Sequence, residues 1–174
     1  ALGGSIRYTT KDATDLLRPG QTMGGFGKLT YDTSAHTFAK SGAAYAAMGG
    51  FEVLGYALQA DGDAYEDGRG NTVVATDVDL LNFLGKIAYE APSGDRVAFS
   101  GEYVNDQGIR PFRANLAVSA VPGNPAAYSF NEAERQTYTF KYNTTKPGGL
   151  YDPEVSLYYN KTSLDRPPLA GCTA

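Results

Sequence analysis

Tryptophan is absent from the 174-residue sequence, and cysteine and histidine occur only once each. A single thiol, Cys172, cannot form an internal disulfide framework, and a zinc site needs more cysteine and histidine ligands than this chain supplies. The lone His36 also argues against a metal site built from several histidines. No run of about eighteen apolar residues occurs, which excludes a transmembrane helix.

Positive charge is sparse and scattered along the sequence. There are 15 lysine and arginine residues against 19 aspartate and glutamate residues, which gives a net charge of −4. Because phosphate recognition needs clustered cations, nucleic-acid binding is not expected. The sequence also has no G-x-S-x-G motif, no phosphate-binding loop and too few histidines for a Ser-His-Asp arrangement. We therefore predict that the chain is not an enzyme and carries no cofactor.

The sequence is rich in segments where apolar and polar residues alternate. In residues 135–144, aromatic residues alternate with threonine, lysine and asparagine, and residues 80–90, 96–105 and 154–161 follow the same pattern. A period of two predicts strands with one apolar and one polar face. At about ten residues each, such strands are long for a soluble sheet and suit a tilted strand that crosses a bilayer.

The connections between the expected strands alternate in length. Gly49-Gly50 forms a predicted two-residue hairpin turn of the primed type, and residues 91–95 and 145–153 are also short connections. Residues 61–79 and 106–134 form long loops, the second with a possible helical turn near 131–135. Short turns at one end and long loops at the other are typical of outer-membrane barrels.

Seven long strands are expected, beginning near residues 22, 37, 51, 80, 96, 135 and 154. Complete bacterial barrels have an even number of strands, so seven fit a piece of a larger barrel. The predicted fold class is therefore all-β: an antiparallel up-and-down meander that forms an open curved sheet and is part of a transmembrane β-barrel.

The alternation also assigns side chains to the two faces of this sheet. The lipid face is predicted to contain Leu81, Phe83, Ile87, Tyr89, Val97, Phe99, Tyr103, Tyr138, Phe140, Tyr142, Val155, Leu157 and Tyr159. The lumen face is predicted to contain Asn82, Lys86, Arg96, Ser100, Glu102, Thr137, Thr139, Lys141, Asn143, Ser156 and Asn160.

The first eleven residues, Ala-Leu-Gly-Gly-Ser-Ile-Arg-Tyr-Thr-Thr-Lys, resemble the end of the plug domain in TonB-dependent outer-membrane receptors. Residues 61–68 and 106–115 are similar to loop segments of the haem and siderophore importers in that family. The resemblance runs in order over nearly the whole chain. It implies that residues 1–20 are the end of the plug and the plug–barrel connection, and that residues 21–174 are the N-terminal portion of the barrel.

This resemblance also implies a function. The chain would be a fragment of a receptor that takes up a ferric siderophore or haem in the bacterial outer membrane. Its partners would be the lipid bilayer, the rest of the barrel and plug, the small iron-chelate or haem ligand, and an inner-membrane energy-coupling protein that acts on the plug. Two alternatives remain open: a complete small outer-membrane barrel with a structural or adhesive role, and a soluble β-sandwich binding module.

Two loops contain candidate binding residues. Asp61, Asp63 and Asp67 could supply hard oxygen ligands to calcium, although the EF-hand spacing is not met and a solvated acidic loop would look the same. In the other loop segment, guanidinium groups suit carboxylates and anionic iron chelates, unless they form loop salt bridges, for example with Asp106 or Glu102. The candidate ligand-binding residues are Arg110, Arg113, Asn115 and, as an aromatic contact, Tyr65.

Overall fold

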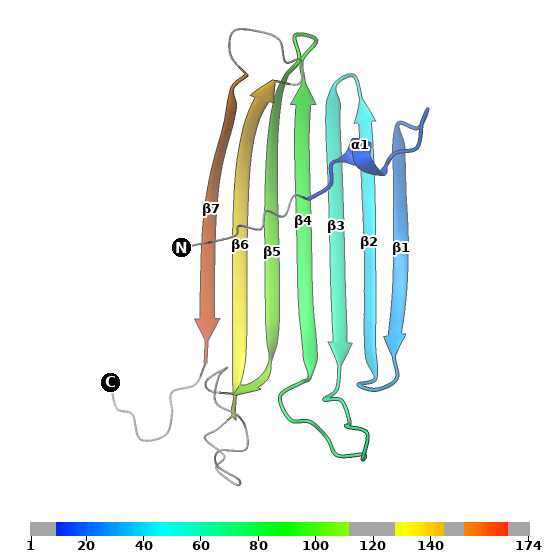
Figure 1. The fold of residues 1–174 in the computed structure, drawn as a ribbon, viewed down its shortest axis with the longest axis vertical. Helices are drawn as coiled ribbons and strands as arrows, with labels where there is room; N and C mark the ends of the chain where they lie inside the picture. Colours follow the sequence, from blue (N-terminus) through cyan, green and yellow to red (C-terminus); the bar gives the residue numbers. More distant parts are fainter. Residues whose placement is uncertain (1–9, 112–127, 145–151, 167–174) are drawn as a thin grey trace, which may run out of the picture.

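Seven antiparallel strands form one open sheet in which every strand pairs with its neighbours in sequence (Figure 1). This computed structural model describes residues 10–111, 128–144 and 152–166. The strands are β1 (Met23–Asp32), β2 (Thr37–Met48), β3 (Phe51–Gly62), β4 (Val78–Glu90), β5 (Asp95–Pro111), β6 (Tyr128–Thr144) and β7 (Glu154–Asp165). The predicted all-β meander is confirmed.

A single helical turn, α1 (Ala13–Leu16), precedes the sheet and lies across β2 and β3 on one face (Figure 1). It was missed at the level of sequence, where residues 11–20 were expected to be only a polar connection. The part of the chain that the structure describes contains no helix long and apolar enough to cross a bilayer. The early strand candidate, residues 5–10, lies almost entirely outside the described residues.

The prediction of a long loop over residues 106–134 is wrong at both ends, because strand residues occupy its first and last parts. Strand β5 continues to Pro111, and β6 begins at Tyr128, so the helical turn expected near 131–135 is a strand. Here Glu132 and Glu134 occupy the face that is apolar lower in the strand. Their carboxylates accept hydrogen bonds from Asn105 and Tyr103. The backbone pairing therefore continues after the apolar alternation has ended.

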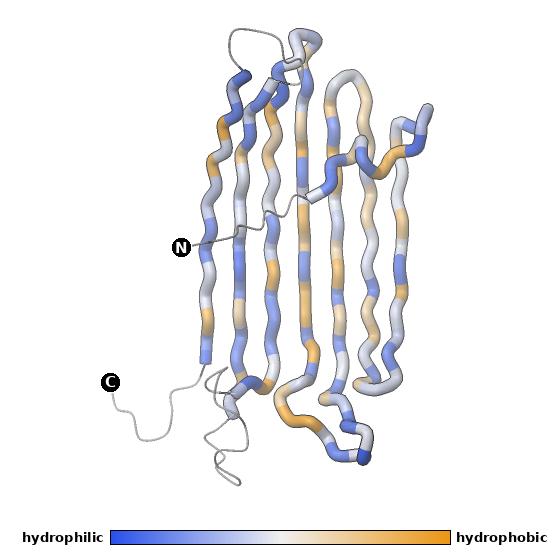
Figure 2. Tube along the Cα trace, viewed as in Figure 1, coloured by the Kyte–Doolittle hydropathy of each residue, from blue (hydrophilic) through white to orange (hydrophobic). Residues whose placement is uncertain are grey.

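The two faces of the sheet differ in polarity as the alternation predicts, and Figure 2 shows hydropathy alternating along the strands. One row of directly paired residues crosses five strands and contains Val53, Ile87, Phe99, Phe140 and Leu157. These residues are between 40% and 62% exposed, and in the described residues no second layer covers them. So extensive an apolar surface marks contact with an apolar environment.

The connections segregate to opposite ends of the sheet. The turns after β2 and β4 lie at one end, and the long loop between β3 and β4 lies at the other (Figure 1). Gly49 and Gly50 have φ values of 60° and 83°, so the predicted primed hairpin turn is confirmed. The Gly50 carbonyl accepts a hydrogen bond of 2.8 Å from the Glu90 amide, which ties this turn to the end of β4.

Replacing Gly50 with alanine should destabilise the fold by about 1–3 kcal/mol, because the residue has a left-handed backbone and its new Cβ would collide with the Glu90 carbonyl. Gly55→Ala is the matched control, since the space around Gly55 on the neighbouring part of β3 is open. Thermal unfolding in detergent measures both variants. Equal stability of the two would contradict the role assigned to Gly50.

Candidate functional site

The segment before β1 is docked on the inner face of the sheet, the face that carries the polar alternation. Ala13 in α1 is 1% exposed and lines a small gap together with Leu54 of β3 and Ala88 of β4, both also buried. The Asp12 amide donates a hydrogen bond of 2.8 Å to the Asp15 carboxylate, which stabilises the first turn of this short helix. A small apolar contact therefore seats α1 against the wall.

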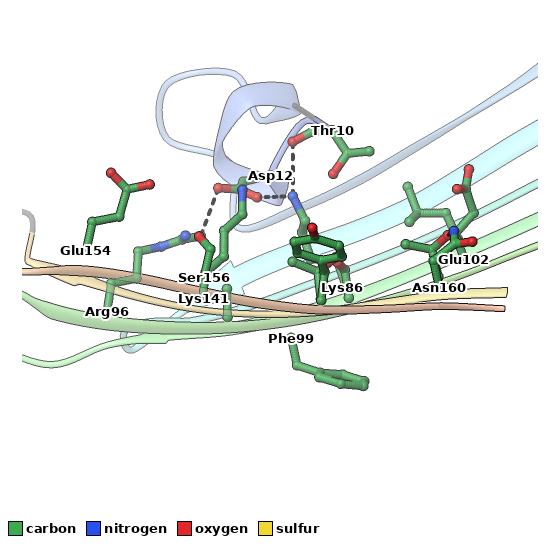
Figure 3. Close-up of a pocket in the computed structure, with 16 residues that line it drawn as sticks. Thr10, Asp12, Lys86, Arg96, Phe99, Glu102, Lys141, Glu154, Ser156 and Asn160 are labelled. Carbon is green, nitrogen blue, oxygen red and sulfur yellow. Dashed lines mark hydrogen bonds and ion pairs between the residues drawn. The ribbon is translucent and has the colours of Figure 1, made fainter. Parts of the chain in front are cut away.

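Four charged side chains fix this segment to three different strands (Figure 3). Arg96 Nη2 lies 2.9 Å from Asp12 Oδ2 and 3.0 Å from Glu52 Oε1. Lys86 Nζ lies 2.5 Å from Asp12 Oδ1. Glu52, Lys86 and Arg96 belong to β3, β4 and β5 respectively. We call these four residues the linker anchor.

The linker anchor also holds the backbone of the docked segment. Lys86 Nζ donates to the carbonyl oxygens of Thr10 at 3.0 Å and Lys11 at 3.2 Å. Glu52 Oε2 accepts from the Thr14 hydroxyl at 3.0 Å and from the Thr14 amide at 3.3 Å. The chain is therefore held on both sides of Asp12, and its position does not depend on one contact.

Two cations and two anions alternate in the linker anchor, so the cluster is neutral. The side chains of Lys86, Arg96 and Glu52 are only 11%, 14% and 11% exposed. Charges this far from water are tolerated only when they are paired and hydrogen-bonded, and removing one partner leaves the others uncompensated. The arrangement suits a fixed structural connection, because Lys86 and Arg96 both form ion pairs with Asp12 of the docked segment.

A groove of about 880 Å³ runs beside the anchored segment along the inner face of β4–β7 (Figure 3). Its walls include Ser100, Thr137, Thr139, Ser156 and Asn160. Figure 3 shows Phe99 on the opposite side of the sheet from Asp12, Lys86 and Arg96, in agreement with the face assignments. The groove also contains charged side chains, among them Lys86, Arg96 and Glu102, and the apolar Leu84 and Ala98, so its lining is mixed in character.

The structure describes two of the four predicted ligand-binding residues, Arg110 and Tyr65. The Arg110 guanidinium forms ion pairs with Asp77 at 3.3 Å and with Asp106 at 3.0 Å. Tyr65 lies in the loop between β3 and β4 and is 41% exposed. Arg113 and Asn115 lie outside the described residues. Ligand binding by these four residues stays a prediction.

The three acidic residues considered for calcium have different surroundings. The Asp67 carboxylate accepts backbone hydrogen bonds from Arg69 at 2.8 Å and Asn71 at 2.9 Å. Asp63 lies 3.8 Å from His36, and Asp61 is at the end of β3. Within the described ranges, no group of three or more histidine, cysteine or acidic residues is arranged to hold a metal ion. A calcium site here stays a prediction.

The linker anchor is the part of the site that sequence reasoning missed. Lys86 and Arg96 were expected on the lumen face from alternation alone, and that placement is correct. Their partner Asp12 lies 74 and 84 residues away in sequence, in a segment with no alternation. An unpaired inward lysine and arginine on adjacent strands was the available signal that an acidic partner was needed.

Comparison with known proteins gives relatives of one kind, although no protein-family model matches the sequence. The chain is 35% identical over 166 residues to the haem transporter BhuA of Brucella ovis, covering 95% of this chain and 24% of the transporter. It is 28% identical over 171 residues to the hemin receptor of Yersinia pestis, covering 97% of this chain and 24% of that receptor. It is 28% identical over 113 residues to the TonB-dependent haem receptor A of Haemophilus ducreyi, covering 64% of this chain and 15% of that receptor.

Solved structures show the same fold. The FrpB iron transporter of Neisseria meningitidis matches in its F5-1 variant with a TM-score of 0.74 and 22% identity, covering 90% of this chain and 26% of that one. The F3-3 variant matches with a TM-score of 0.72 and 20% identity, covering 89% of this chain and 25% of the transporter chain. The chain thus spans about a quarter of the length of the relatives it matches.

A meander of long strands with an apolar outer face, a polar inner face and short turns at one end is part of the wall of an outer-membrane β-barrel. The sequence relatives and the structural matches agree on the kind of barrel. The chain belongs to the TonB-dependent outer-membrane receptors and corresponds to a section of their barrel.

Arg96→Met should weaken docking of the linker by about 1.5–3 kcal/mol, because it removes the charged hydrogen bonds to both Asp12 and Glu52. Arg135→Met is the matched control, since the Arg135 side chain is 51% exposed and its pair with Glu102 should contribute less than about 1 kcal/mol. Amide hydrogen exchange over residues 12–17 measures the effect. Unchanged exchange in Arg96→Met would contradict the anchoring role.

The pKa of Asp67 should lie below its ordinary value of 3.8, because hydrogen bonds from Asn71 and then Arg69 favour the ionised carboxylate. A depressed pKa stabilises the loop fully above the ordinary value, and this stabilisation is lost as the pH falls through the folded pKa. Asn71→Ala removes the side-chain hydrogen bond but keeps the backbone one, so it should move the pKa only part of the way back towards 3.8. Carbon-13 NMR titration of the Asp67 carboxyl measures the pKa in both proteins. The same Asp67 pKa in the variant and in the unmodified chain would refute the prediction.

Proposed function

We propose that the chain connects the plug of a TonB-dependent receptor to its barrel and forms the first part of the barrel wall. Residues 1–20 would be the end of the plug and the plug–barrel connection, and residues 21–174 the N-terminal portion of the barrel. The observation that carries this proposal is the linker anchor, since it holds a segment inside the wall immediately before β1. A segment in this position is what a plug–barrel connection requires.

The receptor that contains this chain takes up haem or a ferric siderophore in this proposal. The names of the relatives support it, since BhuA is a haem transporter and the Yersinia pestis protein is a hemin receptor. The ligand would be captured by the loops at the end of the sheet where Arg110 and Tyr65 lie, with Arg113 and Asn115 as further contacts. Energy would reach the plug from an inner-membrane coupling protein.

A chimera tests this function directly. The matching 166 residues of Brucella ovis BhuA are replaced by this chain, and the chimera is expressed in a strain that lacks its own haem transporter. We expect growth on haemin as the only iron source, because the wall and the plug connection are retained. Unmodified BhuA is the positive control.

The negative control is the same chimera with Asp12→Lys, which places a cation against Lys86 and Arg96 and should prevent docking of the linker. Receptor abundance in the outer membrane is measured for every variant. A chimera that reaches normal abundance but supports growth on neither haemin nor a ferric siderophore would contradict the proposed function.

A further inference from the structure

The loop between β3 and β4, residues 63–77, has hydrogen bonds of its own at the end of the sheet opposite the short turns (Figure 1). The Val73 amide donates to the Tyr65 carbonyl at 2.8 Å. The Thr76 hydroxyl donates to the Val73 carbonyl at 2.7 Å and accepts from the Tyr65 amide at 3.1 Å. The loop is therefore a small hairpin with a defined shape, although the sequence predicted only a long connection.

The first part of this hairpin is tied to the turn between β1 and β2. The Asp63 amide donates to the Ala35 carbonyl at 2.8 Å, and the Glu66 amide donates to the Ser34 carbonyl at 3.4 Å. Ala35 is also buried. These hydrogen bonds join backbone groups, so they do not depend on the side chains of the loop.

The last part of the hairpin is tied to β5 through one side chain. Asp77 Oδ2 accepts a hydrogen bond from the Ile109 amide at 3.1 Å, and Asp77 Oδ1 accepts one from Arg110 Nη1 at 3.3 Å. Arg110 Nη2 in turn pairs with Asp106 at 3.0 Å. The backbone pairing of β4 with β5 ends at Leu80 and Asp106, so the Asp77 carboxylate continues the contact beyond the last paired residues.

The backbone of β5 leaves room for this carboxylate. A Cβ atom at Gly108 would collide with the carboxylate of Asp77 and with the guanidinium of Arg110. Glycine therefore permits the close approach that the hydrogen bond from the Ile109 amide needs. The contact is thus matched on both sides, by an acidic residue in the loop and a glycine in the strand.

We propose that residues 63–77, the rim strut, are a fixed part of the barrel rim and that Asp77 is the positioning residue that locks them. The rim strut joins the β1–β2 turn to the end of β5 and carries Tyr65, a predicted ligand contact. Locked in this way, it presents a preformed surface before haem or a ferric siderophore arrives. This inference rests on the proposed function, because it takes from there the ligand and the end of the sheet that receives it.

The charges around Arg110 favour a role in this lock. Two carboxylates, from Asp77 and Asp106, face one guanidinium whose side chain is 26% exposed. An anionic ligand that displaced one carboxylate would still meet the negative charge of the other at short range. Arg110 therefore acts on the ligand through Asp77 and the rim strut, in line with the loop salt bridge that the sequence left open.

Locking the rim strut lowers the cost of ligand binding. A flexible loop loses conformational entropy when a ligand orders it, whereas a loop that is already ordered does not. Without the Asp77 carboxylate the backbone bonds to the β1–β2 turn remain, but the end that leads into β4 loses its contact with β5. Only a fraction of the receptor then has the binding-competent loop, and the apparent affinity falls by that fraction.

Spin-label distances test the lock in the BhuA chimera. Nitroxides are placed at Arg69→Cys in the rim strut and Lys161→Cys in β7, with all other cysteines, Cys172 included, replaced by serine. We expect one narrow distance distribution that Asp77→Ala broadens several-fold. Glu66→Ala is the matched control, because Glu66 is exposed and contributes to the loop through its backbone, which the substitution retains. Distributions of equal width in the unmodified chimera and Asp77→Ala would overturn the proposal.

Haemin binding tests the effect on the ligand. In the chimera without spin labels, Asp77→Ala should raise the haemin dissociation constant several-fold, and Glu66→Ala should leave it unchanged. Asp77→Asn retains an oxygen that accepts from the Ile109 amide but loses the charge that faces Arg110, so its dissociation constant should lie between those of the unmodified chimera and Asp77→Ala. A broadened distance distribution with unchanged haemin affinity would overturn the positioning role of Asp77.

These measurements separate the inference from the proposed function. The distances require no ligand, so a chimera that binds neither haemin nor a ferric siderophore, but loses its narrow distribution in Asp77→Ala, contradicts the proposed function and retains the lock. A chimera that imports haemin with equally broad distributions in both proteins retains the proposed function and contradicts the lock.

Discussion

Every strand in the hydrocarbon region of a membrane must pair its backbone donors and acceptors, because no water is present to bond them. The seven described strands meet this requirement by pairing with their sequence neighbours throughout. Among the described strands, β1 and β7 each have one edge without a neighbouring strand in this sheet. The continuous pairing leaves side-chain alternation to decide what each face contacts, and the outer face meets lipid with rows such as Ile87, Phe99 and Phe140.

The inner face is organised around charges that need the linker. Lys86 and Arg96 point into the lumen from neighbouring strands, and their separation from water is acceptable because Asp12 and Glu52 neutralise them. The linker anchor therefore joins a local segment to three strands, β3, β4 and β5. Apolar side chains packed under α1, Leu54 and Ala88, extend this fixed region.

Alternation in the sequence was enough to predict the strands, their faces and the Gly49-Gly50 turn, because these depend on local spacing and backbone geometry. It failed where pairing continues without apolar alternation, as at Glu132 and Glu134, whose carboxylates lie on the otherwise apolar face and accept hydrogen bonds from the neighbouring strand. It also missed Asp12, whose partners are distant in sequence.

The central claim is that one face of this sheet contacts lipid and the other faces the lumen with its linker docked. Spin labels placed singly at positions 137 to 142 of β6, in the receptor reconstituted into bilayers, measure this most directly. The account predicts that relaxation by oxygen is strong at 138, 140 and 142, and that a water-soluble nickel complex is excluded there, with weak oxygen relaxation at 137, 139 and 141. Equal accessibility to oxygen at all six positions would contradict it.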